Sequence, residues 1–329
     1  MNRRMLAAAT LLTVMLGAMP AFAQAKYPSK PVRIVIPYAP GGATDIVARL
    51  VADQLRAQFG QTFAVENKPG AFGLIALEEM ARANPDGYTL MIGNTTTNAI
   101  TPIVFANRMT INYLKDVTPV ARLADLPSFF VTNTKNYPPT TYAEHVAYAK
   151  ARPGKVFYGS AGVGSIPHYN NEVIARQAGI QLEHIPNKAG AAGFVKDLLA
   201  GDVHVATLNV ATAAPNIRSG LLRALVVDAP QRLPEHPTVP TWSEVGYAGA
   251  GTTHWQAMFA PSGTPPAILE ALHKAAGEAL KSPLVQTAFQ KSVIRAIPTA
   301  SLAEEKEWLA KEMELWRKIT SDVKIDLGG

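Results

Sequence analysis

Residues 32–59 contain the pattern that most constrains the fold of this chain: a strand, a glycine turn and an amphipathic helix. The run Val32–Ile36 is rich in β-branched side chains, which favour strands. Beyond Gly41 and Gly42, apolar residues recur with helical spacing from Ile46 onwards. A strand that turns directly into a helix leaves the first N–H groups of that helix unpaired at its electropositive end. The pattern therefore predicts a βα unit whose turn is an anion site.

Short β-branched runs alternate with helical patterns along the rest of the chain, which is typical of an α/β fold with a largely parallel sheet. A chain of 329 residues is also long enough for two domains. The predicted strands are Val32–Ile36, 62–65, 89–92, 156–158, 203–208 and 224–227. The predicted helices are 45–59, 74–82, Tyr142–Lys150, one with Thr264 as its N-cap, and a last one that starts with a capping box of Ser301 and Glu304.

A second glycine-rich turn, Gly-Ser-Ala-Gly-Val-Gly-Ser, lies about half-way along the chain. Ser160 and Ser165 offer hydroxyl donors, and Gly162 and Gly164 offer backbone amides. His168 follows one helical turn later and could donate a hydrogen bond; a purely structural histidine is the alternative. Donors that converge on a helix start can hold a carboxylate without an arginine. Two such turns, one in each half of the chain, predict a cleft that holds both ends of a small acid.

The first residues have the parts of a secretory signal peptide: arginines at positions 3 and 4, an apolar run over residues 5–17, and an Ala-Phe-Ala motif that ends at Ala23. Residues 1–23 are therefore predicted to be the signal peptide, with cleavage after Ala25 as the alternative. The apolar run is shorter than the roughly 20 residues that a membrane span needs. The chain has no cysteine to which a lipid could be attached. These features predict a freely diffusing periplasmic protein.

Charge and composition argue against several functional classes. The formal net charge is +6, and removing the two arginines of the signal peptide leaves +4. This modest excess suits a receptor for anionic solutes, or simply a soluble basic protein. Lysine and arginine are scattered, without a basic run interleaved with aromatic residues, so we expect no nucleic-acid binding. The seven histidines are dispersed and cysteine is absent, so we expect no metal and no cofactor.

An exported α/β enzyme is the rival functional class. A nucleophile elbow needs the pattern Gly-x-Ser-x-Gly, and Ser160 follows a glycine directly, without the spacer. A dinucleotide fingerprint needs a third glycine at the position that Pro167 occupies. The sequence therefore predicts a binding protein without catalytic residues.

An ordered series of motifs along the whole mature chain resembles the substrate-binding receptors of the tripartite tricarboxylate transporter family, the Bug receptors. Each motif is weak alone, but the series is specific. It consists of Tyr-Pro-Ser-Lys-Pro-Val-Arg (27–33), Pro-Tyr-Ala-Pro-Gly-Gly-Ala-Thr-Asp (37–45), Val-Glu-Asn-Lys-Pro-Gly (65–70), Pro-Asp-Gly-Tyr-Thr-Leu-Met-Ile-Gly (85–93), Ala-Arg-Pro-Gly-Lys (151–155), Tyr-Gly-Ser-Ala-Gly (158–162), Leu-Arg-Ala-Leu (222–225), Pro-Thr-Val-Pro (237–240) and Ala-Pro-Ser-Gly-Thr-Pro (260–265).

This resemblance implies an α/β, two-lobed periplasmic-binding-protein (Venus-flytrap) fold, with two sheets flanked by helices and two crossover strands. Lobe 1 would hold residues 27–123 and 225–329, and lobe 2 residues 124–224. The resemblance further implies a monomer that binds a small carboxylate, most simply a dicarboxylate, and delivers it to the permease subunits of a tripartite transporter. A periplasmic sensor that signals its liganded state would use the same cleft and is the alternative.

The first turn supplies five candidate ligand contacts. Gly41 and Gly42 let the backbone approach a ligand closely, and the Thr44 hydroxyl can donate to it. Asp45 would repel an anion, so we expect it to cap the helix or to hold a bridging water. Tyr38 either walls the cleft or packs beneath it. A purely structural turn is the alternative for the whole stretch.

Ligands of open α/β sheets bind beyond the carboxyl ends of the strands, which adds further candidates. Lys188, before a predicted helix, could add charge to the cleft or be an ordinary surface lysine. Trp255 could line the wall or lie in the core. The candidates at the strand ends are Asn94, Thr95, Thr96 and Asn209.

Three departures from the family pattern make the expected cleft less polar. They are Phe72 within the stretch Pro-Gly-Ala-Phe-Gly-Leu, Asn187 with the following Lys-Ala, and Leu208 before Asn209. We therefore expect a ligand with an apolar middle, such as an aromatic (phthalate-type) or long-chain dicarboxylate. The alternative is that Phe72 faces the core.

Overall fold

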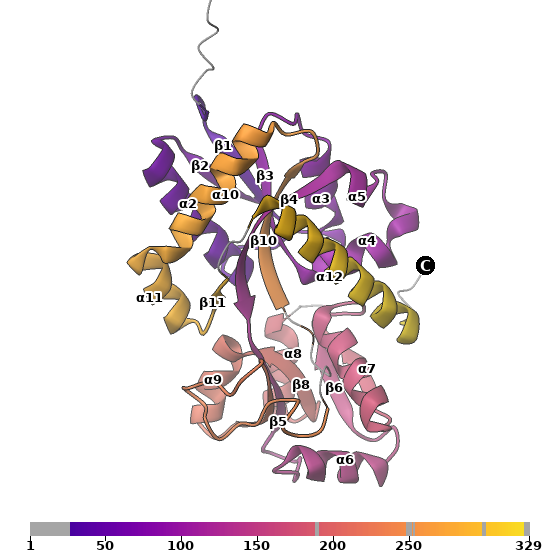
Figure 1. Ribbon diagram of the computed structural model, residues 1–329. Helices are drawn as coiled ribbons and strands as arrows, with labels where there is room; N and C mark the ends of the chain where they lie inside the picture. Colours follow the sequence, from indigo (N-terminus) through magenta and orange to yellow (C-terminus); the bar gives the residue numbers. More distant parts are fainter. Residues whose placement is uncertain (1–26, 188–190, 248–251, 253, 298–300, 326–329) are drawn as a thin grey trace, which may run out of the picture.

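The computed structural model describes residues 27–187, 191–247, 252, 254–297 and 301–325. The predicted signal peptide and Lys188 lie outside these residues. The described chain forms two lobes, each built around its own sheet (Figure 1).

The sheet of the first lobe has six strands, in the order β11-β4-β10-β3-β1-β2. β1 lies parallel to β2 and β3, whereas β10 runs antiparallel to β3 and β4. The sheet is thus mixed, and the expected parallel arrangement holds for only half of it. The strands are β1 (Val32–Ile36), β2 (Phe63–Asn67), β3 (Thr89–Asn94), β4 (Val117–Leu126), β10 (His254–Pro261) and β11 (Arg295–Ala296).

Helices cover both faces of this sheet (Figure 1). Ile34 and Ile36 of β1 pack in a core with α2 and α10, whereas Val35 faces a core with α3 and α12. Burial on both faces explains why the strand is almost continuously apolar. The helices of the lobe are α2 (Ala43–Phe59), α3 (Leu74–Ala81), α4 (Thr101–Val104), α5 (Tyr113–Asp116), α10 (Pro266–Lys281), α11 (Pro283–Lys291) and α12 (Leu302–Asp322), with the short helices η1 (Ala71–Gly73), η2 (Thr96–Ile100, a π-helix) and η3 (Ala106–Arg108).

The second lobe has a five-stranded sheet in the order β7-β6-β8-β5-β9. Its strands are β5 (Ser128–Asn133), β6 (Phe157–Ser160), β7 (Glu183–Pro186), β8 (Val205–Asn209) and β9 (Leu222–Asp228), and its helices are α6 (Tyr142–Lys150), α7 (Ile166–Ala178), α8 (Ala191–Ala200) and α9 (Val210–Arg218). β6 lies parallel to β7 and β8, and β5 runs antiparallel to β8 and β9.

The chain crosses between the lobes at Pro127 and again between β9 and β10 (Figure 1). The predicted return to lobe 1 at residue 225 is wrong. β9 pairs with β5, and Trp242 and Tyr247 pack on the core of the second lobe, so this lobe continues to at least residue 247. A short β-branched run does not show which sheet it joins, because its pairing partner is distant in sequence.

The last helix joins the two lobes on one side. Trp316 of α12 packs edge-to-face on Tyr169 of α7, with ring centroids 5.9 Å apart. Ser301 is the N-cap, as predicted, because the Glu304 amide donates to its Oγ over 3.3 Å; the Glu304 carboxylate accepts from the Ser301 hydroxyl, whereas in a full capping box it would accept from the Ser301 backbone amide. The N-cap of α10 is Pro265 and not Thr264, whose hydroxyl donates to the Pro261 carbonyl.

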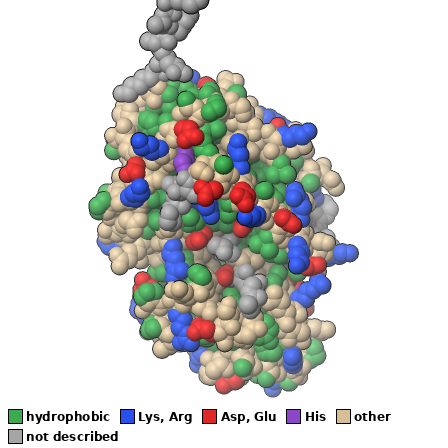
Figure 2. Space-filling view, in the orientation of Figure 1, with side chains coloured by type: hydrophobic (Ala, Val, Ile, Leu, Met, Phe, Trp, Pro, Cys, Tyr) green, Lys and Arg blue, Asp and Glu red, His purple; other side chains and the backbone are tan. Residues whose placement is uncertain are grey.

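Two further observations concern the surface and the helices. On the face shown in Figure 2, acidic and basic side chains are interspersed and form no large patch of one sign. Among the residues described, no helix combines the length and the apolar character needed to cross a bilayer.

Candidate functional site

A cavity of about 390 Å³ lies where strand ends and helix starts of the two lobes meet. Its size falls in the usual range for small-molecule sites. Residues of the first lobe that line it are Tyr38, Gly42, Ala43, Thr44, Phe72, Asn94, Thr96 and His254, and those of the second lobe are Ser128, Ala161, Ser165, Ile166, Pro167, Phe194, Thr207, Leu208, Asn209 and Thr212.

The first turn places the start of α2 at this cavity. Gly41 adopts φ +91°, a conformation that favours glycine, and Gly42 is the N-cap of the helix. The first intrahelical bond runs from the Ile46 amide to the Gly42 carbonyl, over 3.0 Å. The amides of Ala43 and Thr44 therefore have no partner within the helix, and the positive end of its dipole faces the cavity.

Asp45 holds the turn and does not line the cavity. Its carboxylate accepts from the Gly41 amide over 3.0 Å and from Asn67 Nδ2 over 3.1 Å, and it forms an ion pair with Arg49 at 2.9 Å. The Arg49 guanidinium, with the two amide donors, lowers the pKa of Asp45 to about 2. The helix cap expected of Asp45 is wrong, because Gly42 is the N-cap of α2 and no side chain caps the helix; Asp45 instead fixes the backbone of the turn before it. Gly41 likewise does not line the cavity; its positive φ and its hydrogen bond to Asp45 shape the turn.

The end of β3 contributes polar groups next to this turn. Tyr38 lines the cavity and donates to Asn94 Oδ1 over 2.8 Å, and burial raises the pKa of its phenol, so the group is neutral. Asn94 and Thr96 also line the cavity. Thr95 does not, since it is fully buried and its hydroxyl accepts from the Trp255 amide over 3.0 Å.

The second turn brings the start of α7 to the opposite side. Ser165 is the N-cap, and the Tyr169 amide makes the first intrahelical bond to its carbonyl. Ser165, Ile166 and Pro167 line the cavity. The Ser165 hydroxyl donates to the Gly162 carbonyl over 2.7 Å, so it closes the turn at the same time.

The other ligand contacts predicted in this turn are Ser160, Gly162, Gly164 and His168. They form hydrogen bonds with one another within the turn and do not line the cavity. The Gly162 amide donates to Ser160 Oγ over 3.1 Å, and the Gly164 amide donates to His168 Nδ1 over 3.0 Å. The His168 ring stacks on His184, with centroids 3.7 Å apart. Burial, with a smaller effect of His184, lowers the pKa of His168 to about 3. His168 is thus a neutral acceptor that shapes the turn, which corrects the prediction that it donates to a ligand.

The start of α9 is the third helix start that lines the cavity. Asn209 is its N-cap and Thr212 lies in its first turn, and both line the cavity. Ser128 pairs with Asn209 across the sheet and donates to its Oδ1 over 3.2 Å. His254 lines the first-lobe side, and burial lowers its pKa to about 4.

The prediction that Trp255 lines the cavity is wrong. Its ring is fully buried in the core of the first lobe, and Nε1 donates to Glu312 Oε2 over 2.8 Å. Side chains alternate along a strand, so a strand that points His254 toward the cavity turns Trp255 away from it.

Several lining residues were not predicted from the sequence. Thr207 could have been predicted to line the cavity, because it precedes the predicted contact Asn209 by two residues on β8 and so lies on the same face of the strand. Ser128 and Phe194 reach the cavity only through strand pairing and helix packing, for which the sequence has no local signal.

The lining combines neutral hydrogen-bonding groups with apolar walls. None of the described lining residues carries a charge at pH 7. Phe72, Ile166, Phe194 and Leu208 supply the apolar part. The starts of α2, α7 and α9 supply the positive ends of three helix dipoles. This arrangement can hold an anionic group by backbone and hydroxyl donors and can surround an apolar body.

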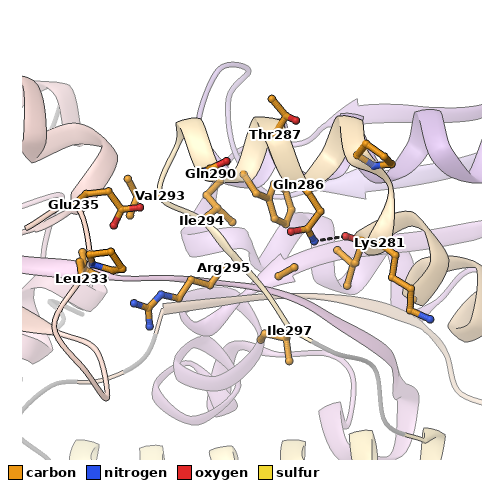
Figure 3. Close-up of a pocket in the computed structure, with 16 residues that line it drawn as sticks. Leu233, Glu235, Lys281, Gln286, Thr287, Gln290, Val293, Ile294, Arg295 and Ile297 are labelled. Carbon is orange, nitrogen blue, oxygen red and sulfur yellow. Dashed lines mark hydrogen bonds between the residues drawn. The ribbon is translucent and has the colours of Figure 1, made fainter.

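A larger cavity, of about 860 Å³, lies between α10, α11 and β11 and the segment that follows β9 (Figure 3). Charged side chains of both signs stand at its edge, among them Glu235, Lys281 and Arg295. Gln286 Nε2 within it is already paired with the Leu280 carbonyl. None of the ligand contacts predicted from the sequence lines this larger cavity, and no parallel strand ends at it. We therefore assign the ligand site to the smaller cavity.

Within the described part of the chain, no group of three or more histidine, aspartate or glutamate side chains is placed to hold a metal ion. The groups that line the cavity are those of a binding site.

Comparison with known proteins identifies relatives along most of the chain. The profile of the family described as "Tripartite tricarboxylate transporter family receptor" matches residues 47–323. The protein BugT of Bordetella pertussis is 33% identical over 297 residues, which cover 90% of each chain. The resemblance stated from the motifs is thereby confirmed.

Solved structures of similar proteins share the fold. The Rhodopseudomonas palustris protein Rpa4515, solved with adipate, is 31% identical with a TM-score of 0.80, and the match covers 91% of this chain and 99% of that one. The periplasmic binding protein BugD is 30% identical with a TM-score of 0.77, covering 90% and 98%. MatC of Rhodopseudomonas palustris, solved with malate, is 29% identical with a TM-score of 0.77, covering 89% and 99%.

These matches confirm the two-lobed periplasmic-binding-protein fold. The family and its structural neighbours are solute-binding receptors and not enzymes, which rules out the exported hydrolase.

Proposed function

The chain belongs to the family of tripartite tricarboxylate transporter receptors, and from that premise we propose that it captures a small dicarboxylate between its lobes and delivers it to the membrane permease of such a transporter. In this proposal the signal peptide is removed after about Ala23, and the mature protein works in the periplasm as a monomer.

One observation carries the proposal: the starts of α2, α7 and α9, from both lobes, line a single cavity without a charged side chain in its described lining. Three electropositive helix ends favour an anion, and their position on two lobes favours a ligand with an anionic group at each end. Each charge-assisted hydrogen bond contributes about 1.5–3 kcal/mol. A handful of them would give a micromolar dissociation constant, which corresponds to about 8 kcal/mol.

Binding and closure are linked in this arrangement. One carboxylate binds first at the starts of α7 and α9 on the second lobe. Closure about the two crossover segments then brings the start of α2 onto the other end of the ligand. Because only the closed form touches both ends, the ligand stabilises that form preferentially. A permease that contacts both lobes could then distinguish loaded from empty receptor.

The similar structures with adipate and malate support a dicarboxylate as the ligand class. The apolar walls favour a ligand whose body is a ring or a methylene chain over a short hydroxylated acid such as malate or citrate. An aromatic or long-chain dicarboxylate would satisfy both the helix starts and the walls.

Calorimetric titration with mono-, di- and tricarboxylates tests this proposal. We expect micromolar or tighter binding of at least one dicarboxylate, and weakening of at least severalfold in both Thr44→Ala and Ser165→Ala, which change one helix start on each lobe. Ser219→Ala, at the exposed far end of α9, is the control and should bind like the wild type. Unchanged affinity in both cavity variants, or no binding of any carboxylate, would contradict the proposal.

Delivery to a permease is tested separately from capture. Deleting the gene should abolish uptake of the radiolabelled dicarboxylate, and a plasmid copy should restore it. Normal uptake combined with a lost transcriptional response to the same acid would instead identify the protein as a sensor.

A further inference from the structure

The turn before α3 holds Phe72 in an unusual backbone conformation. Ala71 has φ +44° and Phe72 has φ +55°, although neither is glycine. A positive φ at a bulky residue is a genuine outlier, and two in succession are costly. Such a conformation persists only where the surrounding structure imposes it.

The surroundings of the turn do impose it. The Thr101 hydroxyl donates to the Phe72 carbonyl over 3.0 Å, and the Gly73 amide donates to the Gly70 carbonyl over 2.8 Å. A Cβ at Gly73 would lie 2.4 Å from Thr97 Oγ1 and 2.9 Å from Pro37 Cβ, so the turn is wedged between η2 and the first turn of the cavity. The Phe72 ring itself stacks on Phe105, with centroids 5.4 Å apart and planes at 22°.

The strained backbone at Ala71 and Phe72 does not bury the Phe72 ring. The Phe72 side chain is 39% exposed and lines the cavity. A strained backbone and an exposed aromatic ring are both unfavourable for stability. Backbone strain of this kind is found where it positions a functional group. The prediction that Phe72 faces the cleft rather than the core agrees with this position.

A second aromatic ring lines the cavity from the other lobe. Phe194 of α8 is almost fully buried in the core of the second lobe and also lines the cavity. Phe72 belongs to the first lobe and Phe194 to the second, so each lobe contributes an aromatic side chain to the lining, but only Phe72 exposes a large part of its surface. A flat apolar ring stacks on such surfaces better than a methylene chain does.

We infer that Phe72 is a specificity-determining residue: its strained turn presents an aromatic surface that selects a benzene dicarboxylate over an aliphatic dicarboxylate of similar length. The inference rests on the proposed carboxylate-binding function and adds the chemical class of the ligand. The Phe72 ring stacks on the body of the ligand, and the helix starts hold its carboxylates.

The test compares acids with and without a ring on the full mature chain. Dissociation constants are measured by calorimetry for the three benzene dicarboxylate isomers, adipate and malate, with wild type, Phe72→Gly and Phe72→Leu. Gly adopts a positive φ without strain, so Phe72→Gly should fold. Phe72→Leu keeps an apolar but non-flat side chain and provides the same readout if the Gly variant fails to fold. Ile75→Ala, an exposed apolar residue of α3 outside the lining, is the control.

We expect wild type to bind one benzene dicarboxylate most tightly, and both Phe72 variants to bind it roughly tenfold more weakly. Adipate affinity should change less than about threefold, and Ile75→Ala should behave like wild type. Equal losses for the aromatic acid and adipate, or preferred binding of adipate or malate by wild type, would overturn the inference and leave the proposed function standing. Failure of all three benzene dicarboxylates to bind would likewise overturn the inference, and the proposed function would fall with it only if no other mono-, di- or tricarboxylate bound.

Discussion

The two glycine-rich turns that bring helix starts to the cavity are similar in sequence but are held in different ways. In the first turn, the Gly41 amide donates to a carboxylate, that of Asp45, which is paired with Arg49. In the second turn, the Gly164 amide donates to the neutral ring of His168, which stacks on His184. The first turn is stabilised by charge and the second by an uncharged imidazole pair.

The difference also concerns where the stabilising groups come from. Asp45 and Arg49 both lie on α2, the helix that the turn begins, and Asn67 of β2 adds one donor to Asp45, so the first turn is fixed mainly by its own helix. His184 belongs to β7, a separate strand, and its Nε2 lies 2.7 Å from Ser160 Oγ. The second turn therefore depends on tertiary packing. Similar anion sites can thus be built from local charge or from distant neutral groups, and the two should respond differently to pH and to mutation.

The largest expected difference between the two turns is in how the stability that each contributes depends on pH. Burial lowers the pKa of His168 to about 3 and that of His184 to about 4. Between these values and about 6.5, the unfolded chain binds protons that the folded chain does not, so stability falls as the pH falls through this window. Asp45, with a pKa lowered to about 2, keeps its stabilising charge until the pH drops below about 4.

The double variant His168→Asn/His184→Gln isolates this effect. Asn can still accept from the Gly164 amide, but neither new side chain titrates. From pH 7 to pH 5, wild type should lose on the order of 3 kcal/mol more unfolding free energy than the double variant, measured by urea denaturation. The comparison of the two proteins is needed because burial raises the pKa of Asp125 and Asp228 to about 6, which acts in the opposite direction. Parallel pH profiles would show that the imidazole pair does not hold the second turn.

Removal of the carboxylate in the first turn should have the next largest effect. Asp45→Ala deletes the acceptor of the Gly41 and Asn67 amides and leaves Arg49 with only its hydrogen bond to Asn67 Oδ1. We expect a loss of about 2 kcal/mol in unfolding free energy, since hydrogen bonds to charged groups are worth about 1.5–3 kcal/mol. Asp53→Ala, at an exposed position of the same helix, should cost less than about 0.5 kcal/mol. Equal effects of the two substitutions would mean that charge does not fix the first turn.

The same distinction between local and distant determinants explains what could be predicted of the fold. β1 and α6 have the predicted bounds, Val32–Ile36 and Tyr142–Lys150, because a β-branched run and a helical period are local signals. The boundary between the lobes near residue 225 was wrong, since β9 is assigned to a sheet only by its pairing with β5. β11 has just two residues and forms only because β4 lies beside it.

In the candidate site, too, local sequence signals were predictive, whereas contacts between distant segments were not. The position of Thr44, Asn94, Ser165 and Asn209 at strand ends or helix starts placed them correctly at the cavity. Gly164 and His168 were predicted to face the ligand, but each is the partner of the other. Residues recruited from elsewhere, such as Phe194, carry no local pattern that marks them.

The smallest expected effect compares one hydroxyl from each turn. The Ser165 hydroxyl donates to the Gly162 carbonyl over 2.7 Å and so supports the second turn. The Thr44 hydroxyl has only a long contact of 3.5 Å with Asn94 Nδ2, and the first turn is held by the Asp45 carboxylate instead. Ser165→Ala should therefore cost about 1 kcal/mol of unfolding free energy, the net value of one hydrogen bond, and Thr44→Ala less than about half of that. Urea denaturation without ligand measures both. If Thr44→Ala proved as destabilising as Ser165→Ala, the first turn would need its hydroxyl as much as its charge, and the contrast between the two turns would not hold.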